Sequence, residues 1–146
     1  MGTIGTGAVN YNAQKLTITS NTAAGYAITA TSSGFLVNPA TGRYIVNAQG
    51  NVTANNTPLP ALMPSSGGYG ISACDSNGRV STTNWGVTTP KFANPSSQFY
   101  YTLVNYSSSL ITGGESIYII YGAKALSSTS PGDYWQIITY SASVVF

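Results

Sequence analysis

Few side chains in this sequence could act as catalytic groups or as metal ligands. The 146-residue chain has no histidine, one cysteine, three acidic and five basic residues, so that 5% of it is charged, whereas a soluble domain usually carries about 25%. Protein metal sites use His, Cys, Asp and Glu, and the complete set here is Cys74, Asp75, Glu115 and Asp133. A Ser–His–Asp triad cannot form without histidine. We therefore expect no catalytic site, no resident metal and no cofactor.

Two arrangements could still support chemistry. Glu115 and Asp133 could act together as the carboxylate pair of a glycosidase. Each of them directly follows a glycine, however, which favours a hairpin turn for both. Cys74 has no histidine to activate its thiol and only Arg79 as a nearby cation, so that a buried, unreactive cysteine is the favoured interpretation. An enzyme is thus the least favoured class of protein.

The sequence predicts no nucleic-acid partner and no membrane span. Nucleic-acid binding needs clustered Lys and Arg, and the net charge here is only +2. No apolar run approaches the ~20 residues of a membrane-spanning helix. The N-terminal residues lack the features of a signal peptide, which indicates either an intracellular or viral protein or a secreted one whose export segment has been removed. The five basic residues stand singly along the chain: Lys15, Arg43, Arg79, Lys91 and Lys124.

The elements that must position any functional residue are predicted to be strands. In residues 14–20, Leu16 and Ile18 alternate with polar residues, and residues 25–31 repeat this period of two, which is typical of half-buried strands. Further candidate strands are 43–47, 69–73, 98–105, 116–121 and 133–146. We predict an all-β chain that forms a single β-sandwich, jelly-roll or immunoglobulin-like, of about seven to nine short, mainly antiparallel strands.

The N-terminal residues 1–12 differ from the rest of the chain. They are rich in glycine, and we expect a flexible segment that precedes a sandwich domain of residues 13–146. Its apolar side chains, Ile4, Ala8, Val9 and Tyr11, could fill a groove of a neighbouring copy. Addition of a strand in this way gains main-chain hydrogen bonds along its length. The segment is therefore a candidate donor strand.

Three sequons permit N-glycosylation, at Asn51, Asn55 and Asn105. A chain so rich in Asn, Ser and Thr contains about this many by chance. We read them as possible sites for glycans only.

Four segments resemble a known group of proteins. Gly113–Lys124, Ser130–Tyr134 and Ile138–Ala142 resemble the closing strands and turns of prokaryotic cell-surface β-sandwich proteins, and Asn21–Ile28 is similar to a segment near their start. More loosely, the chain resembles the TasA-like subunits of biofilm fibres and of archaeal bundling pili, which join by passing a strand to the neighbour. The resemblance implies a secreted or surface-displayed sandwich.

Self-assembly is the function that these observations favour. Charged residues normally protect edge strands from pairing with other chains, and few are present here. We expect a structural subunit of an extracellular filament, pilus or surface layer, whose partners are copies of itself. One alternative is a virion coat or decoration protein. Another is a lectin-like module, because the eleven tyrosines and two tryptophans could stack on sugar rings.

Overall fold

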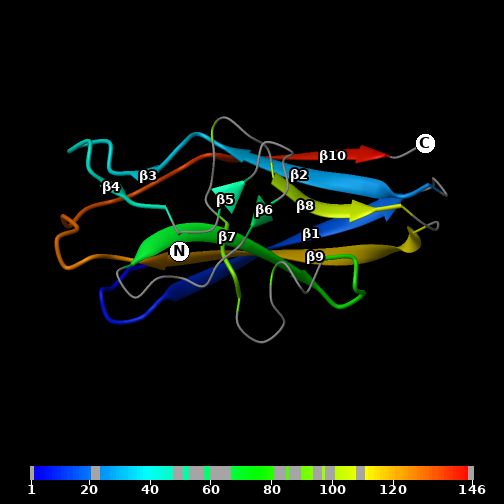
Figure 1. Cartoon of the computed structure of the whole chain (residues 1–146), viewed down its shortest axis with the longest axis horizontal. Coiled ribbons are helices and arrows are strands. Elements are labelled where there is room, and N and C mark those ends of the chain that lie inside the picture. Colours follow the sequence, from blue (N-terminus) through cyan, green and yellow to red (C-terminus); the bar gives the residue numbers. More distant parts are fainter. Residues whose placement is uncertain are drawn as a thin grey trace.

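Two facing three-stranded sheets form the body of the protein (Figure 1). The computed structural model describes residues 2–20, 24–47, 51–52, 58–59, 67–80, 85, 90–93, 97, 101–107 and 111–144. The first sheet has the order β1–β9–β7, with β1 at Asn10–Ser20, β9 at Ile111–Lys124 and β7 at Gly68–Asp75. The second has the order β10–β2–β8, with β10 at Ile138–Val144, β2 at Tyr26–Ser32 and β8 at Tyr101–Tyr106. All these strand pairs are antiparallel.

Four two-residue strands complete the described elements. They are β3 (Leu36–Val37), β4 (Tyr44–Ile45), β5 (Asn51–Val52) and β6 (Pro58–Leu59). β3 pairs with β4, and β5 pairs with β6. The β3–β4 hairpin lies at the left end of Figure 1, away from the C-terminus. There β3 also pairs with the segment before β10, because Val37 and Trp135 exchange two backbone hydrogen bonds of 3.0 and 2.9 Å.

The core lies between the two sheets and follows the predicted alternation. On β2, Tyr26, Ile28 and Ala30 are each 2% exposed or less, and Leu16 and Ile18 of β1 pack against the same core. The largest fully buried side chains include Ile71 of β7, Val104 of β8, and Ile117 and Ile119 of β9, together with Trp85 and Phe92. The prediction of an all-β sandwich is therefore confirmed.

Two predicted boundaries were wrong. Residues 133–146 do not form one strand: β10 begins at Ile138, and the residues before it join β3 only through the bridge at Trp135. β9 is longer than expected and runs through the two glycines that precede Glu115. The register between β1 and β9 shifts at this point, and Gly114 has a φ of 76°. The glycine pair thus allows a β-bulge within one strand, and not the predicted hairpin turn.

Candidate functional site

β1 and β10 are edge strands of the two sheets. Among the described residues, β1 pairs only with β9 and β10 pairs only with β2. The eleven residues of β1 contain one charged residue, Lys15, and the seven residues of β10 contain none. Each edge therefore presents backbone N–H and C=O groups with little charge to deter another strand.

A groove of about 1330 Å³ lies between these two edges. Its walls include Asn12 and Gln14 of β1, Tyr121 of β9, and Ile138 and Tyr140 of β10. Residues on β10 that are two apart face the same side of the sheet. Ile138 and Tyr140 therefore share the inner face with Ala142 and Val144.

The inner face of β10 is incompletely covered beyond the groove, toward the end of the strand. Ala142 is exposed although it is paired with the buried Ile28, and Val144, which is paired with the buried Tyr26, is 45% exposed. These apolar side chains lie on the face of β10 whose other residues, Ile138 and Tyr140, pack against the core, yet they are exposed. An additional strand beside β10 would cover them.

A pair of tyrosines bridges the groove. The hydroxyl of Tyr121 donates to Oε1 of Gln14 at 2.8 Å and also contacts the hydroxyl of Tyr140. Because a phenol has one proton to donate, Tyr140 is the donor to Tyr121. Burial, and then the hydrogen bond with Tyr121, raise the pKa of Tyr140 well above the usual value of a tyrosine. The bridge therefore stays protonated and links β1, β9 and β10.

The structure places the N-terminal residues along the same groove. Ile4 is partly buried against the core, and the carbonyl of Gly5 accepts a hydrogen bond of 3.1 Å from the backbone N–H of Ala125. Ala8 is exposed and Val9 is half-buried. These residues are thus in contact with their own domain through Ile4 and Gly5.

Tyr11 lies within a strand and not before it. β1 begins at Asn10, so the strand includes the last three residues of the segment that was expected to be flexible. Tyr11 is 54% exposed, and its ring stacks on Phe92 with a centroid distance of 6.0 Å. Among the four candidate donor residues, Tyr11 is therefore the one that the fold of its own chain uses as a strand residue.

A buried ion pair lies away from the groove. Glu115 is 2% exposed, and its Oε1 accepts a hydrogen bond of 2.9 Å from Nε of Arg79. Its Oε2 accepts from the hydroxyl of Tyr26, also at 2.9 Å. The guanidinium carbon of Arg79 lies 3.8 Å from the centre of the Tyr106 ring, which is a cation–π contact. Both carboxylate oxygens of Glu115 therefore have a donor.

The surroundings of Glu115 alter the pKa of both donors. Burial, and then the hydrogen bond to the carboxylate, raise the pKa of Tyr26 far above its usual value. Burial acts to lower the pKa of Arg79, but the hydrogen bond and the negative charge of Glu115 outweigh it and raise that pKa. The donors thus keep their protons over the whole neutral range, as a structural ion pair requires.

The two carboxylates that could have formed a glycosidase pair are in different environments. Glu115 is buried in β9, where the turn prediction was wrong, whereas Asp133 is exposed in the segment before β10. No contact between them is found among the described residues. The third acidic residue, Asp75, has a structural role. Asp75 accepts hydrogen bonds from the backbone N–H groups of Asn77, Arg79 and Val80, which fixes the turn after β7.

Cys74 has surroundings that oppose its ionisation. It is a free, partly exposed thiol at the end of β7. Burial, and then the charge of Asp75, raise its pKa, while Arg79 is engaged with Glu115. This agrees with the predicted low reactivity, although the side chain is less buried than expected.

The remaining predicted sites are distributed over different elements. Asn105, near the end of β8, is exposed, and so is Ser107 of its sequon. Asn51 begins β5, and Asn55 lies outside the described residues. In the described part of the chain, no group of three or more His, Cys, Asp or Glu residues could hold a metal ion. The same part has no helix that is long and apolar enough to span a membrane.

Comparisons with protein-family models, curated proteins and solved structures found no match to this chain. Any function must therefore be argued from the groove, the edges and the surface.

The sequence contains one further signal for the groove, in the alternation of β10. Ile138, Tyr140, Ala142 and Val144 form an unbroken apolar alternation in an edge strand. By contrast, the inner-facing residues of the first half of β1 are polar, with Asn12 and Gln14 both exposed. An apolar face opposite a polar one predicts an uncovered seam, but only once the two strands are known to face each other.

Proposed function

We propose that this protein is a structural subunit that joins copies of itself by β-strand addition, in an extracellular filament, pilus or surface layer. The observation that carries the proposal is the uncovered inner face of β10 beside its open edge. The extracellular location rests on the resemblance of Gly113–Lys124, Ser130–Tyr134, Ile138–Ala142 and Asn21–Ile28 to cell-surface sandwich proteins.

The open edge of β10 offers an added strand both main-chain hydrogen bonds and apolar side chains to cover. Its seven residues include no charge and no proline, which are the usual means of blocking an edge. A strand added beside it would form main-chain hydrogen bonds along about 23 Å. Its inward side chains would cover Ala142 and Val144, which are exposed in the single chain.

The N-terminal residues 2–9 have the length and pattern of a donor. Eight residues span about 26 Å when extended, enough to cover β10. Ile4 and Ala8 would lie on one face of such a strand, because residues an even number apart share a face. In the single chain, Ile4 packs against the core, Gly5 accepts one backbone hydrogen bond and Val9 is half-buried, while the other residues of this segment are exposed. Exchange of the segment between copies would thus replace few contacts and add a strand pairing.

Electron microscopy of the purified full-length protein tests the proposal. We expect ordered polymers from the unaltered chain. Ala142→Lys should abolish them, or raise the concentration needed for assembly by about tenfold or more, which corresponds to about 1.4 kcal/mol. The substitution places a charge on the inner face of β10 where the donor would lie, and Ala142 is exposed, so the fold is retained.

Ser141→Lys is the matched control. Ser141 is exposed and lies on the same strand, but it faces outward. This variant should still polymerise, because its charge does not enter the groove. Equal assembly of the two variants would overturn the proposal.

Removal of residues 1–9 tests the donor. The truncated chain should not form polymers, and Ile4→Asp in the full chain should weaken polymerisation in the same direction. Circular dichroism spectra and thermal unfolding of both variants show whether the sandwich is retained. Unimpaired polymers from both variants would refute donation by this segment.

A further inference from the structure

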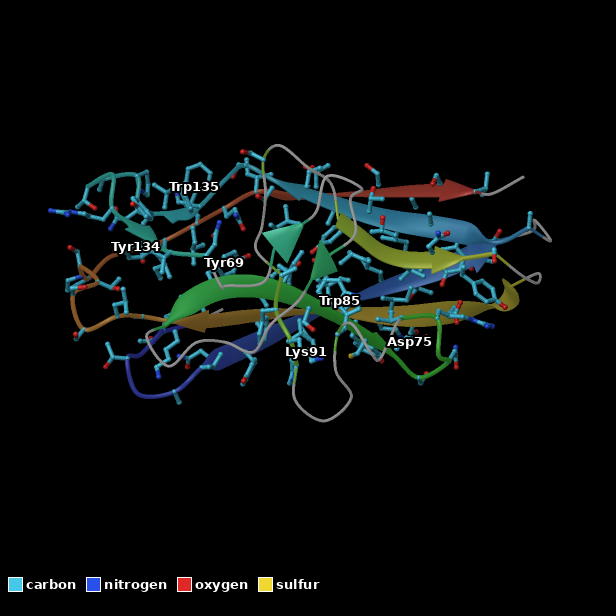
Figure 2. The ribbon with its side chains drawn as sticks, viewed as in Figure 1. Tyr69, Asp75, Trp85, Lys91, Tyr134 and Trp135 are labelled. Atoms are coloured by element: carbon cyan, nitrogen blue, oxygen red, sulfur yellow. The ribbon has the colours of Figure 1, made fainter. Side chains whose placement is uncertain are left out.

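The outer face at the β3–β4 end carries a cluster of exposed apolar side chains, which we name the tip patch. Its members are Phe35 at 47% exposure, Tyr44 at 53%, Val46 at 40%, Trp135 at 53% and Ile137 at 58%. They make up five of the eight large apolar side chains that are exposed in the described part of the chain. Figure 2 shows Trp135 at this end of the molecule, and Asp75 toward the opposite end.

The strand register places these side chains on one face. Val37 is paired with Tyr44 on one side and with Trp135 on the other, and residues directly opposite each other in antiparallel strands point to the same face. The rings of Phe35 and Tyr44 stack with a centroid distance of 4.8 Å. The residues of alternate parity, Leu36 and Ile45, are 5% and 3% exposed and face the core. The tip patch is therefore the outer side of a hairpin whose inner side is already buried.

The size of the tip patch suits a protein contact. Three aromatic and two aliphatic side chains, each about half exposed, present about 400 Å² of apolar surface. Patches of about 300–600 Å² are the largest on a typical monomer and are often functional. Two such patches in contact, with their polar margins, reach the about 1,000 Å² that a specific interface needs.

The chemistry of the tip patch favours a protein surface over a sugar. Val46 and Ile137 offer no hydrogen bonds, and the rings of Phe35 and Tyr44 cover each other's faces. A sugar site needs free aromatic faces with polar neighbours, whereas flat, apolar sheet faces pack on one another about 10 Å apart.

The charges at the margin of the tip patch match a two-fold arrangement. Arg43 precedes Tyr44 on one side of β3, and Asp133 lies two residues before Trp135 on the other. Both charged residues are exposed, and in the described part of the chain neither forms an ion pair. β4 and the segment of Trp135 both run antiparallel to β3, so they run parallel to each other. The two charged residues therefore lie at the same end of the patch on opposite sides of β3, with Arg43 at the margin because it alternates with the outward-facing Tyr44.

We propose that the tip patch binds the tip patch of a second copy about a two-fold axis along β3. Rotation about this axis places Tyr44 of one copy against Trp135 of the other, and Arg43 of each against Asp133 of the other. Val37 lies on the axis and meets its own counterpart. Trp135 and Asp133 also line one end of the groove, but the contact leaves the open edge of β10 free. It is therefore distinct from strand addition and would join chains or filaments laterally.

Sedimentation of the Ala142→Lys protein separates this contact from strand addition, because that variant blocks the groove alone. We expect a concentration-dependent dimer. Trp135→Glu should weaken dimerisation by about tenfold or more, since central aromatic residues dominate such interfaces. Tyr118→Glu is the matched control, because Tyr118 on β9 is 38% exposed outside the tip patch, and it should leave the dimer unchanged.

Charge reversal tests the arrangement of the two copies. Arg43→Glu and Asp133→Arg should each weaken the dimer, and the double variant should restore it. With Cys74→Ser, a short bis-maleimide should cross-link Val37→Cys to its counterpart. A monomer at all concentrations would overturn the proposal, and so would loss of the dimer in Tyr118→Glu. A dimer without charge rescue or the Val37→Cys cross-link would overturn the two-fold axis.

Discussion

Nε of Arg79 donates a hydrogen bond of 2.9 Å to Oε1 of Glu115, and the hydroxyl of Tyr26 donates one of the same length to Oε2. Arg79 comes from the turn after β7, Tyr26 from β2 and Glu115 from β9. Three of the eight charged residues of the chain, Asp75 included, thus fix one turn and connect the two sheets. Although the chain has few charged residues, these three have structural roles and are not free on the surface.

Tyr26→Phe should destabilise the fold by about 1.5–3 kcal/mol, because it leaves one oxygen of a buried carboxylate without its donor. Urea unfolding followed by fluorescence measures the loss. Tyr134→Phe is the control: its hydroxyl donates to the carbonyl of Ser130 at 2.8 Å, and loss of a hydrogen bond between neutral groups should cost about 0.5–1.5 kcal/mol. Equal losses would contradict the role given to Glu115.

The protein should lose stability as the pH rises above 10. Burial raises the pKa of Tyr26, Tyr69 and Tyr140 above the usual 10.0, so above that pH the unfolded chain releases protons that the folded chain keeps. The folded state then binds more protons than the unfolded state, and stability falls with pH. Below pH 10 this contribution is fully present. Thermal unfolding between pH 8 and about 11.5 should show a decline that starts near 10.

Tyr140→Phe should reduce this alkaline decline. The variant has one fewer tyrosine to ionise on unfolding, so its unfolding temperature should fall less steeply above pH 10. A decline as steep as that of the unaltered protein would contradict the raised pKa of Tyr140.

Gly122→Ala should destabilise the first sheet by about 1–3 kcal/mol. A Cβ on Gly122 would lie 2.5 Å from the ring of Phe92, which is fully buried and cannot move aside. Gly113→Ala on the same strand is the control, since a Cβ there meets nothing within 4 Å. Chemical denaturation of both variants measures the difference, and equal stability would show that the ring can shift.

Cys74 should be alkylated slowly by iodoacetamide at neutral pH. Burial and Asp75 raise its pKa above 9.0, and the thiolate is the reacting form. The rate should rise with pH later than for a free cysteine. In Asp75→Asn the rise should shift to lower pH, because the nearby negative charge is gone. An unfolded sample in urea provides the reference rate.

The local pattern of the chain was enough to predict most of the sandwich. The alternation of Leu16 with Ile18, and of Tyr26 with Ile28, identified the buried faces of two strands before their partners were known. Side chains in a strand alternate strictly, so the sequence carries this information within a few residues. The glycines before Glu115 were harder to interpret, because the same Gly–Gly pair suits a turn or a bulge. Only the pairing of β1 with β9 distinguishes them.

The features that the sequence could not predict depend on which strands become neighbours. Composition alone determined that the chain has no histidine, little charge and no obvious catalytic constellation. The tertiary structure decided that Glu115 is buried beside Arg79, that β1 and β10 face each other across a groove, and that Val37 aligns Tyr44 with Trp135. Each of these relationships joins residues far apart along the chain. Periodicity fixes which way a side chain points, but only the register and the strand order fix what it meets.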